Sequence, residues 1–69
     1  MRIGYINIVL PGGAERKVKS IERGDGDMSD AHRKDQALRI EEIKFQKEIS
    51  QGSRLRLYNA QGRLEIESE

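Results

Sequence analysis

Cysteine is absent from this sequence, and histidine is nearly so. Without cysteine the chain forms no disulfide and no thiolate metal site. The single histidine, His32, leaves too few imidazoles for a histidine-based zinc site. We therefore expect no metal and no cofactor, and we interpret His32 as a solvated residue rather than a general base or a ligand.

Large aromatic side chains are also few, with no tryptophan, one phenylalanine and two tyrosines among 69 residues. A chain this short buries only about 60% of the surface that its unfolded form exposes. So thin a core often needs disulfides, a metal or a second subunit for support. Because the first two are disfavoured here, we expect residues 1–69 to form a single domain that acts as a homo-oligomer.

The sequence has no strong excess of one charge sign and no long apolar run. Charged residues make up 36% of the chain, yet the net charge is only +1, whereas nucleic-acid-binding modules usually have a clear basic excess. No stretch approaches the roughly 18 apolar residues of a membrane span. Residues 1–13 have the outline of a signal peptide, but Gly4, Tyr5 and Asn7 interrupt the apolar part. We expect a cytoplasmic protein with no membrane partner.

The stretch RLRLYNAQGRLEIE, residues 54–67, predicts a β-hairpin. Leu55 and Leu57 alternate with polar residues before a turn signal, and Leu64 and Ile66 alternate with them after it. The intervening residues 59–62, Asn-Ala-Gln-Gly, suit a type I turn.

This turn also predicts a register for the hairpin. The expected opposite pairs are Tyr58 with Arg63, Leu57 with Leu64, Arg56 with Glu65, Leu55 with Ile66, and Arg54 with Glu67. One face is then apolar, and the other holds two opposite-charge pairs, each contributing about 0.2–1 kcal/mol. An isolated hairpin is marginal in water, so the apolar face needs a partner.

The first part of the chain predicts two more strands. Residues 1–10 are apolar on both sides in their second half, which favours a central strand. Pro11 and the two glycines after it end this strand. Residues 14–23 either return as a second strand, with a bulge near Ser20, or form a short helix, because Val18 and Ile21 are spaced for neither period.

Residues 24–30, GDGDMSD, predict a flexible loop. Its aspartates, Asp25, Asp27 and Asp30, are potential calcium ligands. The EF-hand pattern nevertheless fails, because its sixth position is Asp30 instead of glycine and its twelfth is Gln36 instead of glutamate. We interpret the loop as a solvated turn.

Residues 29–50 predict a helix that is rich in good helix formers. Ser29 or Asp30 is suited to cap its start, and Gly52 is suited to end it. Apolar residues form two stripes, one with Leu38, Phe45 and Ile49 and the other with Ala37, Ile40 and Ile43. The pattern does not decide which stripe faces a sheet, and two β-strands with a bulge at Glu41 and Glu42 remain an alternative for residues 38–49.

Together these elements predict a small α+β fold in ββαββ order. An antiparallel sheet includes the C-terminal β-hairpin, and one helix packs on it. A helix that is apolar on two sides is explained if it lies between the sheet and a second subunit.

No nucleophile, base and orienting group occur together, so we expect no enzymatic activity. The sequence favours a non-catalytic regulatory or protein-interaction module that binds itself and another protein. The candidate interaction residues are apolar residues of the predicted helix, namely Ile40, Ile43, Phe45 and Ile49.

The alternative is a dimeric DNA-binding transcriptional regulator or antitoxin-like protein with a basic hairpin face. Its candidate contacts are Arg16, Lys17, Lys19, Arg54, Arg56 and Arg63. Glutamates opposite the arginines would cancel part of this charge, which favours the protein-interaction interpretation over nucleic acid.

Residues 52–67, GSRLRLYNAQGRLEIE, resemble the C-terminal hairpin of AbrB/MazE-type DNA-binding proteins. That resemblance implies a swapped-hairpin dimer and a regulator or antitoxin. It rests on a Gly-polar-basic-apolar start and a Gly-Arg-apolar return, and it covers under a quarter of the chain. The preceding segment, RIEEIKFQKEIS, lacks the expected Ile-Pro-Lys/Arg element. The resemblance implies DNA contacts mainly in the portion of the chain that does not match, so no contact residue is carried over.

Overall fold

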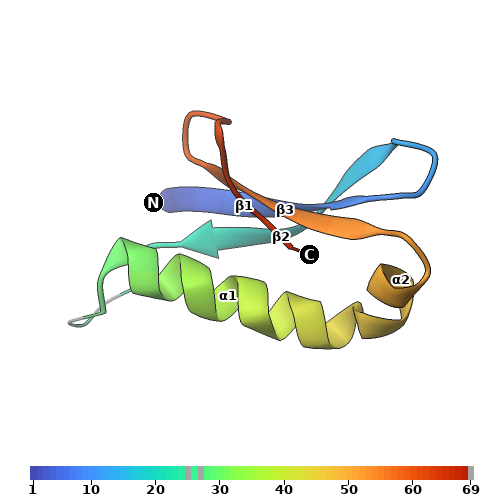
Figure 1. Cartoon of the computed structure of the whole chain (residues 1–69). Helices are drawn as coiled ribbons and strands as arrows, with labels where there is room; N and C mark the ends of the chain where they lie inside the picture. Colours follow the sequence, from blue (N-terminus) through green and yellow to red (C-terminus); the bar gives the residue numbers. More distant parts are fainter. Residues whose placement is uncertain (25, 27, 69) are drawn as a thin grey trace.

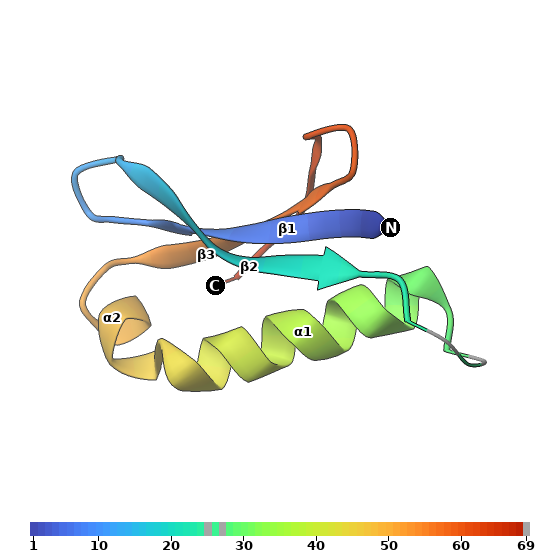
Figure 2. The ribbon, with the colours of Figure 1, turned by 180° about the vertical axis from the view of Figure 1, so that it is seen from behind.

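A computed structural model describes residues 1–24, 26 and 28–68. These residues form two layers, a four-stranded antiparallel sheet in the order β2-β1-β3-β4 and a helix on one of its faces (Figure 1). The view from behind agrees, with the helix again along one side of the sheet (Figure 2). The elements are β1 (Arg2–Val9), β2 (Glu15–Glu22), α1 (Asp30–Lys44), α2 (Gln46–Ser50), β3 (Arg54–Asn59) and β4 (Leu64–Glu67). The predicted α+β class and ββαββ order are confirmed.

β1 is a central strand, as its apolar character predicts, because β2 and β3 pair with it on either side. Ile6 lies opposite Leu57 and Ile8 opposite Leu55 in an unbroken register. These four side chains are fully buried and form the centre of the core beneath the helix layer. The other face of the sheet, which the helices leave uncovered, we call the open face.

Residues 14–23 contribute strand β2, so the short-helix alternative is wrong. The bulge predicted near Ser20 is present, and its extra residue is Val18, since Ile6 lies opposite Lys19 while Asn7 lies opposite Lys17. Val18 and Ile21 both reach the core. The bulge explains their spacing, because it shifts by one residue which side chains face the helix.

The segment after the loop is helical, so the two-strand alternative for residues 38–49 is wrong. The Ser29 side chain caps α1 by accepting the N–H of His32 at 3.2 Å. The predicted single helix is interrupted at Phe45, and α2 turns towards the start of β3 (Figure 1). Gly52 ends it with a positive φ of 103°, the backbone conformation in which glycine is favoured.

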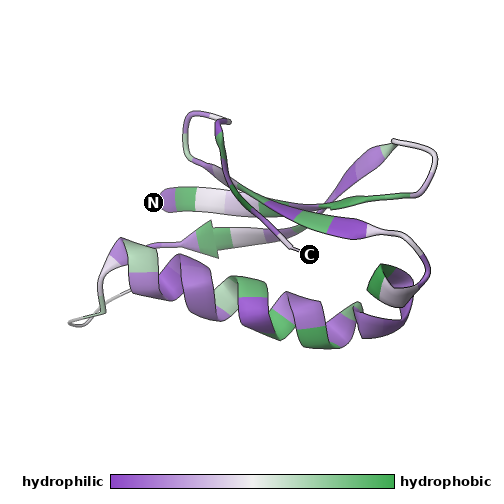
Figure 3. Ribbon diagram, in the orientation of Figure 1, coloured by the Kyte–Doolittle hydropathy of each residue, from purple (hydrophilic) through white to green (hydrophobic). Residues whose placement is uncertain are grey.

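The sheet selects one of the two apolar stripes of the helix. Leu38 is buried, and Phe45 and Ile49 pack against the same core together with Ala37. Ile40 and Ile43 are 52% and 74% exposed. Figure 3 accordingly shows hydrophobic bands on an α1 ribbon that is otherwise mainly hydrophilic.

The predicted register of the C-terminal hairpin is wrong, although the turn is right. The Gly62 N–H donates to the Asn59 carbonyl at 3.0 Å, as a type I turn requires. Gly62 follows with a φ of 83°. The N–H of Asn59 then donates to the carbonyl of Arg63 at 2.9 Å, whereas the predicted register had placed Tyr58 opposite Arg63. A further bulge leaves Tyr58 opposite Leu64, Leu57 opposite Ile66 and Arg56 opposite Glu67.

The bulge in β4 also changes the predicted ion pairs. Glu65 does not pair with Arg56 but reaches Lys34 of α1, with an N–O distance of 2.8 Å. Glu67 pairs with Arg56 at 2.7 Å instead of with Arg54. The added residue turns a cross-strand pair into a contact between the sheet and the helix, which simple alternation does not anticipate.

Two residues of the predicted loop, Asp25 and Asp27, lie outside the described part of the chain, so the flexible loop and its calcium ligands are not tested. Asp30 opens α1 and receives two hydrogen bonds from Arg23, at 2.7 and 3.2 Å. These bonds hold the pKa of Asp30 below its ordinary value. Across residues 1–24, 26 and 28–68, no helix is long and apolar enough to cross a membrane.

Candidate functional site

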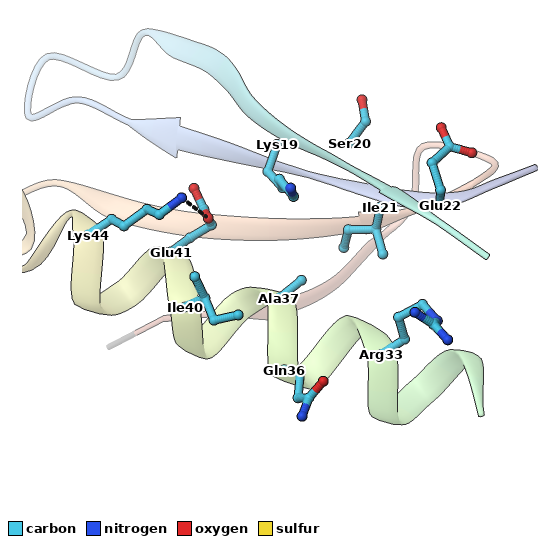
Figure 4. Close-up of a pocket in the computed structure, with 10 residues that line it drawn as sticks. All are labelled: Lys19, Ser20, Ile21, Glu22, Arg33, Gln36, Ala37, Ile40, Glu41 and Lys44. Atoms are coloured by element: carbon cyan, nitrogen blue, oxygen red, sulfur yellow. Dashed lines mark ion pairs between the residues drawn. The ribbon is translucent and has the colours of Figure 1, made fainter. Parts of the chain in front are cut away.

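A groove runs between strand β2 and helix α1 (Figure 4). We call it the β2–α1 groove. It is lined from both sides, by Lys19, Ser20, Ile21 and Glu22 of β2 and by Arg33, Gln36, Ala37, Ile40, Glu41 and Lys44 of α1.

Alternation along β2 determines which of its side chains enter the groove. Lys19 and Ile21 point towards α1, whereas Ser20 and Glu22 point away (Figure 4). From the helix, Ala37 lies across from Ile21. Because Ile21 is buried and Ile40 is half-exposed, the groove has an apolar floor with an accessible apolar wall.

Cationic groups exceed anionic ones in the β2–α1 groove. Lys19, Arg33 and Lys44 all line it. Of its two carboxylates, Glu22 points away, and Glu41 is 4% exposed and lies 3.6 Å from the Lys44 ammonium (Figure 4). The groove therefore presents an apolar floor beneath a positive rim.

A second surface lies on the side of α1 that is turned away from the sheet. Ile43 sits in a shallow depression formed with Arg39, Glu42 and Gln46. We call these residues, together with the neighbouring Ile40, the α1 outer face. Arg39 pairs with Asp35 at 3.1 Å, so the charges around the exposed isoleucines are of both signs.

The open face carries a polar network centred on Glu15. Its carboxylate accepts hydrogen bonds from the Tyr58 hydroxyl at 2.7 Å, from Arg56 at 3.0 Å and from Asn7 at 3.4 Å. Tyr58 stacks on Tyr5 with ring centroids 5.1 Å apart. The hydrogen bond to Glu67 is the main cause that raises the pKa of Arg56, and the charge of Glu15 adds to it, so the cation lies between two carboxylates.

The Tyr58–Glu15 hydrogen bond has a measurable pH signature. It raises the pKa of Tyr58, as does burial, and it lowers the pKa of Glu15. Its contribution to stability is complete only above the ordinary Glu value of 4.5 and below the ordinary Tyr value of 10.0. It is lost as the pH falls through the Glu15 pKa or rises through the Tyr58 pKa.

We expect Glu15→Gln to lower the pKa of Tyr58 towards that of a free tyrosine, because the charged acceptor is removed. Tyrosinate absorbance during a pH titration measures this, in a Tyr5→Phe background where Tyr58 is the sole tyrosine. Glu65→Gln is the matched control, since Glu65 contacts Lys34 instead. An unchanged Tyr58 pKa in Glu15→Gln would contradict the assignment.

The structure separates the basic residues proposed to contact nucleic acid. Lys17 and Arg56 lie on the open face, one on each side of Asn7, and Arg54 is exposed on the same face at the start of β3. Lys19 instead lines the β2–α1 groove. Arg16 lies opposite Ile8, in a row of the core face, and Arg63 follows the hairpin turn. The six residues therefore do not form one continuous basic surface.

The four candidate interaction residues also separate. Ile40 and Ile43 are exposed, whereas Phe45 and Ile49 pack against the core. The sequence reasoning missed the β2–α1 groove and the role of Glu15, because both depend on which strand forms the edge and which residues lie opposite each other. A partial signal for an edge was available in the three basic residues of β2, since lysines are common on edge strands.

Within the described ranges, no three His, Asp or Glu side chains come together as metal ligands. Comparisons of the chain with protein-family models, curated proteins and solved structures found no match. The resemblance to the AbrB/MazE hairpin thus remains confined to residues 52–67.

Proposed function

We propose that this chain is a non-catalytic protein-interaction module that associates with a second copy of itself through the α1 outer face. The observation that carries the proposal is the exposure of Ile40 and Ile43, at 52% and 74%, on a helix whose other apolar stripe already covers the sheet. Complete burial of a fully exposed isoleucine is favourable by about 1.5–3 kcal/mol, and these two side chains gain the part of it that corresponds to their exposed area.

The charges around Ile43 support a second copy as the partner. Arg39 and Glu42 both line the depression, and Arg39 is already paired with Asp35. A two-fold interface places the same patch on both sides, so a patch with balanced charge does not repel its copy. Support of this kind is also what a 69-residue chain without disulfides needs.

Protein partners are favoured over nucleic acid by the arrangement of the arginines. Arg56, the central cation of the proposed basic face, is bound to two carboxylates. A phosphate would have to compete with both of them. Nucleic-acid binding therefore stands as the second candidate, supported by the exposed Arg54 and Lys17.

We expect the unchanged chain to self-associate and the double variant Ile40→Glu/Ile43→Glu to be a folded monomer. Introducing carboxylates on the α1 outer face places like charges against each other across the interface, while both positions are too exposed to disturb the core. Sedimentation equilibrium measures the association, and circular dichroism checks the fold.

Leu10→Glu is the matched control, because Leu10 is 42% exposed at the β1–β2 turn, outside α1. It is expected to associate like the unchanged chain. A chain that is monomeric at high concentration before any substitution would overturn the self-association. In a parallel run with a DNA duplex at low salt, binding that weakens steeply as salt rises would promote the second candidate.

A further inference from the structure

The outer edge of β2 presents backbone groups that have no strand beside them. β2 is the first strand in the order β2-β1-β3-β4, and within residues 1–24, 26 and 28–68 only β1 pairs with it. An edge strand directs a row of N–H and C=O groups outward, which is a template for an added strand. At eight residues, β2 is long enough for several such hydrogen bonds.

The β2–α1 groove lies beside this edge. A strand added alongside β2 would direct every second side chain to the helix side of the sheet. There those side chains would meet Ile21 and Ala37, apolar residues of the groove that do not belong to the α1 outer face. Backbone pairing together with pockets for alternate side chains is a recurrent way in which proteins recognise extended peptides.

Charge determines which extended segment suits the site. Lys19, Arg33 and Lys44 line the groove, and Arg16 and Lys17 precede them on exposed positions of β2. The Glu15 carboxylate is occupied by Arg56 and Tyr58 on the open face. A segment with acidic residues therefore gains electrostatic attraction beside residues 16–19, but not beside the exposed Glu22 at the end of β2.

The same charges disfavour a second β2 as the added strand. Pairing two copies along this edge would place side by side two strands that each carry three basic and two acidic side chains. Lysines on an edge strand are a known protection against such self-pairing. Self-association is thus directed to the α1 outer face, and the β2 edge is left for a different partner.

We infer that β2 and the β2–α1 groove bind an extended acidic segment of a partner protein, which presents both acidic and apolar side chains to the groove. The segment adds a fifth strand to the sheet next to β2. This inference rests on the proposed function as an interaction module and names the chemistry of the partner.

The probe is a capped nonapeptide that repeats Glu-Glu-Val, so that each face of the added strand carries both residue types. It is titrated into the isotopically labelled chain and followed by amide NMR. We expect shifts confined to β2 and the facing side of α1, with binding that weakens as salt rises. Lys19→Glu should weaken binding about tenfold, since it reverses a charge beside the peptide. Lys47→Glu, the same change in α2 and outside the groove lining, should leave binding within about twofold.

A second peptide with a methyl group on every backbone nitrogen keeps the side chains and charges but loses the backbone donors of both edges. We expect it not to bind. The inference would be overturned if this peptide bound as tightly as the first. It would also be overturned by amide shifts on the open face or in β4, or by the absence of shifts in β2 at millimolar peptide. An oligonucleotide that perturbs the groove more strongly than the peptide would overturn it as well.

The titration is repeated on Ile43→Glu, because Ile43 lies outside the groove. Peptide binding by this variant alongside a monomeric unchanged chain would refute self-association and keep the inference. Self-association of the unchanged chain without any peptide binding would refute the inference and keep the proposed self-association.

Discussion

Leu57→Ala is expected to remove most of the stability of this domain. Leu57 is fully buried and lies opposite Ile6 on one side and Ile66 on the other, in the middle of the sheet. Truncating a buried leucine costs about 2–5 kcal/mol, partly because a cavity remains. A 69-residue domain has a free energy of unfolding of only about 3–10 kcal/mol.

Urea denaturation followed by circular dichroism measures this loss, since the chain has no tryptophan for fluorescence. Leu64→Ala is the matched control, being the same substitution on the adjacent strand β4 at a side chain that is 50% exposed. We expect its cost to stay below about 1 kcal/mol, because little transfer energy and no cavity are involved. Equal losses in the two variants would contradict the assignment of the core to the helix-covered face.

Gly4→Ala is expected to destabilise the domain by about 1–3 kcal/mol, the usual range for overpacking, or more. A Cβ at this position would lie 2.5 Å from the backbone carbonyl oxygen of Tyr58 and 3.7 Å from the Lys34 side chain. The first neighbour belongs to the backbone of β3, so it yields only if the central β1–β3 pair moves apart. The Lys34 side chain, which crosses here towards Glu65, lies at ordinary van der Waals distance and would not have to shift.

Gly12→Ala is the control for this substitution. Gly12 lies in the β1–β2 turn, where an added Cβ meets no atom within 4 Å. Alanine lowers the conformational entropy of the unfolded chain relative to glycine. The replacement is therefore neutral or stabilises the fold by about 0.4–1 kcal/mol. Thermal or urea denaturation measures the change in the free energy of unfolding for both glycine variants. A Gly4→Ala variant as stable as Gly12→Ala would contradict the close approach of β1 and β3.

Local patterns in the sequence predicted the order and type of the elements. The alternation around Leu55 and Leu57 indicated a strand, and the turn at residues 59–62 formed where its residue types favour it. Ser29 caps the helix and Gly52 ends it, as their side-chain chemistry and backbone freedom imply. Each of these features depends on residues only a few positions apart.

The register and the exposed surfaces could not be predicted in the same way. Bulges at Val18 and in β4 moved whole sets of side chains relative to their neighbours, and a single added residue was enough to send Glu65 to Lys34. The sequence placed Ile40 and Ile43 on one stripe, but it did not say that the sheet would pack on the other. That choice depended on Leu38, Phe45 and Ile49 meeting the isoleucines of β1.

The sequence by itself determined that this chain has no disulfides and a C-terminal hairpin, and it favoured an α+β fold with a capped helix, because propensity, capping and alternation act over short distances. Only the tertiary structure decided that β2 is an edge, that a cationic groove runs between it and α1, and that Ile40 and Ile43 stay exposed. The physical reason is that strand order, bulges and the burial of one helix face are set by contacts between segments far apart in the chain, and several pairings of those segments satisfy the same local pattern.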